Sequence, residues 1–596
     1  MRLNEKDSRS DTTCSEGVCD TRTQRPAEWQ NLPAGSGARS KQVSLFEAVS
    51  RSVRPGDQIV FSFSHNRPHA AAFEVARQFR DSHSLELVGT GLIEYASVLY
   101  AAGVVLRMQS AFMGNSFPSP APARVLGEAI SNEGGHDPHW TNLTMNLRLM
   151  AGAMGWPFVP VRSLKGSDLG KGEGRAVVDD PFGSGSVQVI APLTPDVAFV
   201  HGVIADTLGN TVVYGPDGED LWGAYAARTV VVTAEKVVCP EEFRRLGHRP
   251  GLPGNRVSWV SEVPYGAHPQ AVFVWNDDGV RPYAEDYPMR AELRRLSRDP
   301  AAMRAWVEEW VFPGNHETYL ARLGSERLEE LHAAAQAPVP EHPPIPADIP
   351  TSSEECAGVL AMREAVARVE SGSHELLFAG IGLSHIAAWA AEDLCHSKGL
   401  AAMLVAETGL YGFRPAKGDP YLFNPPNTRS SLFHSDFIHT LGVLGGPTAE
   451  RCLTMLGAGQ MDRKGNINSS MTANGTFLVG SGGANDLVNG NSDYVVVMPA
   501  GKGRFVDRLP FVTSPVGHLV AVATDLGLLE RSSVTGDLEI AAVIAEPDHV
   551  DQVVEALVNA CGWSVVVRKD LRRIDPPTQE EVALLRSFDP ERKLLG

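Results

Sequence analysis

A strand–turn–helix order that occurs twice limits the possible folds of this chain more than any other pattern in it. In the first half, a strand over residues 58–63 is followed by a turn and by an alanine-rich helix that begins at His69. In the second half, a strand over 375–378 leads through the turn Gly380-Ile-Gly382 to a helix that begins at Ser384. Alternating strands and helices are typical of a mainly parallel sheet covered by helices. The sequence therefore predicts an α/β fold with two related open domains, fused in tandem.

A short polar tag supports this duplication. Asp206-x-x-Gly209-Asn210 in the first half recurs as Asp462-x-x-Gly465-Asn466 in the second. A β-branched or apolar strand follows each tag, over 229–233 and 494–498. Several short matches in the same order indicate a repeat more strongly than any single match does.

Changes in composition predict the domain organisation. Residues 333–353 are rich in proline, which stiffens a chain without giving it a core, and we place an inter-domain linker there. The first domain then covers residues 41–332 and the second covers 354–596. Residues 1–40 are polar and lack a period, which predicts a disordered tail. A charged tail is expected after a final strand over 564–567.

Charge and hydropathy exclude several functional classes. The formal charge of −18 disfavours binding to nucleic acid and to anionic membrane surfaces. No apolar run reaches the roughly 18 residues that a membrane span needs, and no signal peptide is visible. Seven widely spaced cysteines fit reduced thiols, and no metal-ligand cluster is evident. The sequence predicts a cytoplasmic protein without nucleic-acid, membrane or metal partners.

One carboxylate stands at the end of an apolar strand. The run from Leu400 to Ala406 stops at Glu407, directly before the turn Thr408-Gly409. Such a position holds a side chain on a rigid support, near backbone that only glycine lets come close. The same pattern also fits a solvated surface carboxylate, so it leaves a catalytic role open when taken alone.

A glycine-rich loop over 480–487 follows an apolar strand that is expected to end at Val479. Loops of this kind expose several N–H groups that bind an anion or a developing oxyanion. They also occur as tight packing turns, and this alternative stays open.

Together these motifs resemble those of the class I CoA-transferases, and of the glutaconate type in particular. Glu407-Thr-Gly409 resembles the Glu-x-Gly signature of the beta subunit, and segments 380–382, 457–466 and 482–487 resemble three further beta-subunit motifs in the same order. Segments 140–145, 151–163 and 196–206 resemble the alpha subunit. The resemblance spans roughly residues 45–530. It implies a CoA-transferase-like (NagB-like) fold with both subunits fused in one chain.

The resemblance implies a ping-pong reaction with Glu407 as the catalytic nucleophile. Its carboxylate attacks an acyl-CoA thioester and forms an acyl-glutamyl anhydride, which becomes a glutamyl-CoA thioester and passes CoA to a carboxylic acid. The glycines expected to supply oxyanion donors or to contact CoA are Gly482, Gly483, Gly380, Gly382 and Gly409. Coenzyme A is then a substrate rather than a permanently bound cofactor. The family also implies a homo-oligomer, a dimer or higher.

Three first-half residues are candidate substrate contacts. His65 and Arg67 lie in the turn before the first helix and offer groups that bind a substrate carboxylate or a CoA phosphate, although a surface or capping role is equally open. His139 stands where glutaconate-type members commonly carry an acidic residue, so it is either a substituted base or a loop histidine. Two other functions stay open at this point. One is hydrolysis of an acyl-CoA thioester or carbon–carbon bond on the same scaffold, and the other is non-catalytic binding of acyl-CoA.

Overall fold

The computed structural model describes residues 39–596 except 64, 133–134, 217, 219, 247–250, 276–278 and 339–348. The predicted disordered tail, apart from residues 39 and 40, lies outside the described residues, and so does the middle of the predicted linker.

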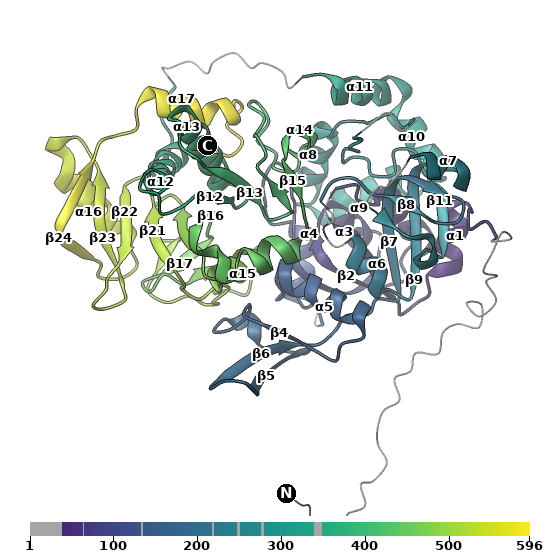
Figure 1. The fold of residues 1–596 in the computed structure, drawn as a ribbon, viewed down its shortest axis with the longest axis horizontal. Coiled ribbons are helices and arrows are strands. Elements are labelled where there is room, and N and C mark those ends of the chain that lie inside the picture. Colours follow the sequence, from purple (N-terminus) through teal and green to yellow (C-terminus); the bar gives the residue numbers. More distant parts are fainter. Residues whose placement is uncertain are drawn as a thin grey trace, which may run out of the picture. The chain divides into compact units, whose positions relative to one another are not determined.

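The first half is built around a parallel sheet (Figure 1). Its strands run in the order β3-β2-β1-β7-β9-β11, and each neighbouring pair is parallel. Their bounds are β1 Gln58–Phe61, β2 Leu85–Leu92, β3 Val105–Met113, β7 Val197–Asp206, β9 Thr229–Val238 and β11 Trp259–Glu262. Two short antiparallel strands, β8 (Thr211–Val212) and β10 (Gly251–Leu252), pair beside β7.

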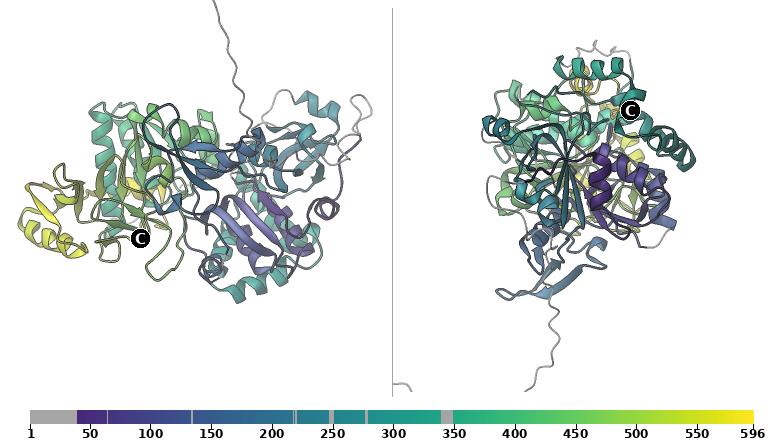
Figure 2. Two further views of the ribbon diagram at one scale, coloured as in Figure 1. Left: turned by 90° about the horizontal axis from the view of Figure 1, so that it is seen from below. Right: turned by 90° about the vertical axis from the view of Figure 1, so that its right-hand side faces the viewer.

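Helices cover both faces of this sheet, and successive side chains of a strand point to opposite faces, so both sets of side chains are buried. Ile59 and Phe61 enter the core that holds α1 (Leu45–Ser52), α2 (His69–Gln78) and α3 (Glu94–Ala101). Val60 enters the core that holds α5 (Asn142–Met154) and α6 (Asp220–Ala226). Figure 2 gives further views of these helices around the sheet.

The second half repeats this topology. Its strands β13-β12-β16-β19-β21 are parallel and follow the same order as β2-β1-β7-β9-β11. Their bounds are β12 Leu376–Ala379, β13 Met403–Ala406, β16 Cys452–Leu456, β19 Asp493–Val497 and β21 Leu519–Ala523. Helices α12 (Ser353–Glu370), α13 (Leu383–Ser397) and α17 (Gln579–Phe588) cover one face. The predicted pair of related α/β units with mainly parallel sheets is confirmed.

The repeated polar tag is one turn used twice. The Asp206 carboxylate accepts hydrogen bonds from the N–H groups of Leu208 and Asn210, both at 2.9 Å, and from Asn210 Nδ2 at 2.7 Å. Asp462 accepts the equivalent bonds from Lys464 N at 2.9 Å, Asn466 N at 3.0 Å and Asn466 Nδ2 at 2.9 Å. An aspartate followed four residues later by an asparagine therefore closes the same turn in each half.

Two sequence predictions were wrong in local structure. The segment before the glycine loop is not a regular strand, because its backbone bonds are divided between two partners. Leu478 N donates to Ser470 O at 2.8 Å and Val479 N to Ser469 O at 3.3 Å, whereas Val479 O accepts from Met113 N at the end of β3 at 3.0 Å. The expected charged tail folds as β24 (Val566–Ile574) and α17. Arg568 pairs with Glu530 at 2.5 Å and with Glu539 at 3.2 Å, so neighbouring strands neutralise the charges that suggested a tail.

Residues 41–596 form one compact unit. One apolar cluster contains residues of both halves, and within it Phe63 stacks on Phe437 at 6.2 Å between ring centroids. The domain boundaries around residues 332 and 354 therefore stay a prediction. No helix in the described part of the chain has both the length and the apolar content needed to cross a bilayer.

Candidate active site

Glu407 directly follows β13, as the apolar run predicts. The Thr440 hydroxyl donates to the Glu407 carbonyl oxygen at 2.6 Å. Gly409 turns the chain with a φ of +110°, and a Cβ there would lie 2.2 Å from the Ser435 carbonyl oxygen. Only glycine fits this turn, which fixes the backbone next to Glu407.

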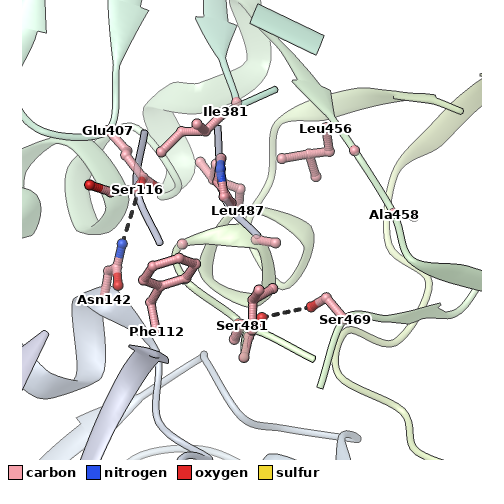
Figure 3. Close-up of a pocket in the computed structure, with 18 of the residues that line it drawn as sticks. Phe112, Ser116, Asn142, Ile381, Glu407, Leu456, Ala458, Ser469, Ser481 and Leu487 are labelled. Carbon is pink, nitrogen blue, oxygen red and sulfur yellow. Dashed lines mark hydrogen bonds between the residues drawn. The ribbon is translucent and has the colours of Figure 1, made fainter. Parts of the chain in front are cut away.

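The Glu407 carboxylate meets the first residue of a first-half helix. Asn142 Nδ2 donates to Glu407 Oε1 at 3.3 Å, the dashed line beside Glu407 in Figure 3. Helix α5 begins there because Thr141 and Thr144 form a capping box, with Thr144 N donating to Thr141 Oγ1 at 3.1 Å. The N-terminal end of a helix carries partial positive charge, which favours a carboxylate beside it.

A cavity of about 280 Å³ opens at this contact, with Glu407 and Asn142 in its wall (Figure 3). Residues of both halves line it, and most of the lining is apolar. The first half contributes Phe63, Phe112, Ser116 and Pro120, and the second contributes Phe378, Ile381, Phe423, Leu456 and Leu487. The site therefore offers one carboxylate and a few polar groups at the edge of a hydrocarbon-lined space.

Burial raises the pKa of Glu407 to about 7, and the negative charge of Asp486 adds to this effect. Hydrogen bonds from Asn142 and from the Gly483 N–H lower the pKa and offset part of the shift. Both the ionised and the protonated forms are therefore populated near neutral pH. A carboxylate with a raised pKa is also a more basic nucleophile than an ordinary glutamate.

The glycine-rich loop contacts the carboxylate through one of its two predicted donors. The Gly483 N–H donates to Glu407, and a Cβ on Gly483 would lie 2.5 Å from Glu407 Oε2. The Gly482 N–H instead donates to the Ala111 carbonyl oxygen at 3.0 Å. Its expected role as an oxyanion donor therefore needs correction, because that donor already closes the loop against β3.

The other glycines predicted for the site separate into two groups. Gly380 lines the cavity. Gly382 and Gly409 are not among its lining residues: Gly382 precedes α13, and Gly409 forms the turn after Glu407. These two glycines shape the backbone next to the cavity.

His65 and Arg67 are buried behind the cavity wall rather than on the surface. His65 shares a hydrogen bond with Thr428 Oγ1 at 3.0 Å, and burial lowers its pKa to about 3, so the ring is neutral. Arg67 Nη1 donates to Ser116 Oγ at 3.4 Å, and the guanidinium lies 4.7 Å from the centre of the Phe63 ring. The His65 ring also packs edge-on against the lining residue Phe423, with 6.3 Å between centroids, so both residues contact the lining from outside the cavity.

His139 packs against a second-half aromatic ring. Its ring stacks on Phe511 with 5.0 Å between centroids, and burial lowers its pKa. It is not among the residues that line the cavity. The loop interpretation of this histidine fits these contacts better than a role as a base.

Sequence reasoning missed two polar residues of the site, Asn142 and Asp486. Both lie within segments that resemble the family, but no local sequence pattern indicates that either side chain contacts or faces Glu407. The capping box of Thr141 and Thr144 is the signal that locates the start of α5, and with it Asn142. Asp486, whose buried carboxylate accepts three hydrogen bonds, has no comparable local signal.

Comparison with known proteins shows that this chain is similar to CoA-transferases. The family model "Coenzyme A transferase" matches residues 43–262. One of the subunits of glutaconate CoA-transferase from Acidaminococcus fermentans is 28% identical over 319 residues, which cover 49% of this chain and 94% of that protein. Two different subunits of 3-oxoadipate CoA-transferase from Pseudomonas knackmussii also match. They are 28% identical over 275 residues and 26% identical over 263 residues, which cover 45% and 40% of this chain and 93% of each relative.

A solved structure matches nearly the whole chain. An acyl-CoA transferase from Escherichia coli O157:H7, in a thioester complex with CoA, aligns with a TM-score of 0.61. The alignment covers 91% of this chain and 96% of that chain at 14% sequence identity. At this identity the match supports only the fold, and the aligned region includes both halves of the chain.

Proposed function

This chain belongs to the class I CoA-transferase family, and from that premise we propose that it moves CoA from an acyl-CoA to a carboxylic acid through covalent intermediates on Glu407. The observation that supports this most directly is the placement of Glu407. Its carboxylate lies in the wall of an apolar cavity, with hydrogen-bond donors from both halves on its oxygens.

The first half-reaction transfers CoA to the enzyme. A Glu407 oxygen attacks the thioester carbon, the carbon–sulfur bond breaks, and CoA leaves as a thiolate while an acyl-glutamyl anhydride forms. The thiolate then attacks the Glu407 carbonyl carbon of the anhydride. The released product is the carboxylate of the donor acyl group, and Glu407 is left as its CoA thioester.

The second half-reaction reverses these steps with a new acid. The acceptor carboxylate attacks the glutamyl thioester, thiolate leaves, and a second anhydride forms. Thiolate attack on its acyl carbon gives the new acyl-CoA and restores the Glu407 carboxylate. Binding energy from the nucleotide part of CoA, distant from the reacting atoms, lowers the barrier of these steps.

Asn142 and Gly483 are the proposed oxyanion donors. Both donate to the Glu407 carboxylate, and Asn142 bonds Oε1, so a donor lies close to the Glu407 carbonyl group on which charge develops when thiolate attacks its carbon. Donors held in place before the reaction stabilise such charge without reorganisation. The apolar lining favours an acyl group with a hydrocarbon portion in the cavity.

We also propose that the chain fuses the two kinds of subunit found in its relatives. The first half, residues 41–332, is alpha-like, and the second, 354–596, is beta-like and carries Glu407. Matches to two different subunits of one 3-oxoadipate CoA-transferase support this, as does the repeated strand order. Coenzyme A then enters as a substrate, and self-association stays a prediction from the family.

Initial-rate kinetics test the transfer reaction. With one acyl-CoA and several short mono- and dicarboxylic acids, a ping-pong enzyme gives parallel double-reciprocal lines, and Glu407→Gln loses transfer. Steady release of free CoA without any acceptor acid would contradict the proposal. Transfer by Glu407→Gln at the wild-type rate would do the same.

A further inference from the structure

A second buried carboxylate, Asp486, joins the two halves next to Glu407. It lies on the short helix α15 (Ala484–Val488), directly after the glycine loop, and only 3% of the residue is exposed. Three first-half groups donate to it: Thr141 Oγ1 at 2.5 Å, Ser163 Oγ at 2.6 Å and Leu143 N at 3.0 Å. The carboxylate therefore holds two separate first-half segments against the loop.

These contacts fix the first turn of α5. The Leu143 N–H is one of the N-terminal helix donors that have no partner within the helix, and Asp486 supplies its acceptor. Thr141 is the N-cap residue of the same helix. Between them stands Asn142, whose side chain donates to Glu407 and whose N–H donates to the Gly482 carbonyl oxygen at 3.0 Å. A shift of Asp486 would therefore move the Asn142 donor relative to Glu407.

We propose that Asp486 is a positioning residue for Glu407: it fastens the first turn of α5 to the glycine loop, which holds Asn142 against Glu407, and its negative charge acts on the same carboxylate. The proposal rests on the transfer function proposed above, because it assigns Asp486 a part in preparing the nucleophile. Asp486 itself reaches no reacting atom in this scheme.

The charge of Asp486 acts on Glu407 only if no nearby cation neutralises one of the two carboxylates. Burial raises the pKa of Asp486 to about 7, and its hydrogen bonds to Ser163, Thr141 and Leu143 lower it. The groups that shift the pKa of Glu407, besides burial, are Asp486, Asn142 and Gly483. No Arg, Lys or His contributes to either shift among the described residues.

The ionisable side chains on neighbouring elements have other partners. Arg162, beside Ser163, donates to the Gly442 carbonyl oxygen at 3.2 Å. His439, on the one-turn helix Ile438–Val443, shares a hydrogen bond of 3.1 Å with the Tyr411 hydroxyl. Asp436, before that helix, accepts from the His439 N–H at 2.8 Å. Asp486 is therefore the charge to which Glu407 is expected to respond.

The test replaces Asp486 by asparagine and measures the titration of Glu407 directly. Carboxyl ¹³C NMR of glutamate-labelled protein follows the ionisation, and the spectrum of Glu407→Gln assigns the Glu407 signal. Asp486→Asn removes the negative charge, which lowers the Glu407 pKa, and loosens the Asn142 hydrogen bond, which raises it. The charge has the larger effect, so the Glu407 midpoint is expected to move to lower pH, by up to about one unit. Transfer at pH 8 is expected to fall about 10- to 100-fold, since Asn142 is no longer held in place.

Asp206→Asn is the matched control. Asp206 is also a buried carboxylate with three hydrogen bonds, but it closes a turn in the first half, away from the cavity lining. Its variant is expected to lose stability without moving the Glu407 midpoint. An unchanged midpoint in Asp486→Asn, or the same shift in Asp206→Asn, would overturn the proposal.

Ser163→Ala provides a second variant that removes one donor from Asp486 and keeps its charge. If Asp486→Asn does not fold, slower transfer by Ser163→Ala supports the positioning role, and an unchanged rate overturns it. Failure of the proposed function would look different. A wild-type protein that transfers no CoA, but whose Glu407 midpoint responds to Asp486→Asn, would overturn the transfer reaction and support this inference.

Discussion

Glu407, the proposed nucleophile, has a carboxylate without a cationic partner among the described residues. Its carboxyl group is buried beside another acid, and burial raises its pKa from an ordinary 4.5 to about 7. The folded protein therefore binds the Glu407 proton more tightly than the unfolded chain does. This group costs stability increasingly as the pH rises from about 4.5 through about 7.

Glu407→Gln should consequently stabilise the protein in a pH-dependent way. The amide keeps the shape of the side chain and removes the buried charge, so the gain is expected to be about 1–3 kcal/mol at pH 8 and close to zero at pH 5. Thermal denaturation of wild type and variant at both pH values measures it. An equal gain at pH 5 and pH 8 would show that the charge of Glu407 is not the cause.

Asn142→Ala should shift the pH profile of transfer in the opposite direction from Asp486→Asn. The Asn142 hydrogen bond favours the ionised form of Glu407, so its loss raises the Glu407 pKa and moves the acid limb of kcat/KM to higher pH. Loss of a proposed oxyanion donor is expected to lower the rate by about 100-fold.

Asn146→Ala is the control for this change. Asn146 is buried on the same helix. Its Nδ2 donates to Thr90 Oγ1 at 3.0 Å and to the Asn142 carbonyl oxygen at 2.9 Å rather than to Glu407. An acid limb that moves equally in both variants would argue against a specific role of Asn142.

The elements of this fold could be predicted well where the sequence pattern is local. Apolar runs located β1 and β12, and the strand that ends at Glu407 is β13. The pattern failed at Val479, because its backbone bonds are divided between Ser469 and the first-half residue Met113. It failed after Val567, because Glu530 and Glu539 of neighbouring strands pair with Arg568. The contact between Asn142 and Glu407 joins residues of different halves, so no local pattern reports it.

The glycine loop approaches Glu407 so closely at Gly483 that a side chain there would collide with the carboxylate. Gly483→Ala should abolish transfer, because its Cβ would lie 2.5 Å from Glu407 Oε2 and 3.0 Å from a methyl group of Leu441. Gly501→Ala is the matched control, since a Cβ there meets nothing within 4 Å. Transfer rates of the two purified variants measure the effect. Full activity of Gly483→Ala would contradict the close approach of loop and carboxylate.

At the scale of the whole molecule, one site is assembled from two similar units. Asn142 and the cavity residues Phe63 and Phe112 come from the first unit, while Glu407 and the glycine loop come from the second. The repeated topology could be predicted from sequence, since it depends on patterns within each half. The way the halves share a core could not, because that core depends on contacts such as the stacking of Phe63 on Phe437.

Cleavage between the halves should preserve the proposed transfer activity. A protease site inserted within residues 339–348 allows the purified protein to be cut there. The shared apolar cluster and the hydrogen bonds on Asp486 are expected to hold the halves together, so they should co-elute and keep transferring CoA. The uncut insertion variant is the control. Halves that separate on size exclusion and lose activity would contradict this account of the interface.

The proposed mechanism requires a covalent bond between Glu407 and CoA. Incubation with an acyl-CoA in the absence of an acceptor acid, followed by proteolysis and mass spectrometry, measures that bond directly. The expected result is a peptide containing Glu407 with the added mass of CoA, absent in Glu407→Gln and lost when borohydride reduces the thioester. An unmodified Glu407 peptide during active transfer, or CoA bound to a different residue, would show that Glu407 is not the nucleophile.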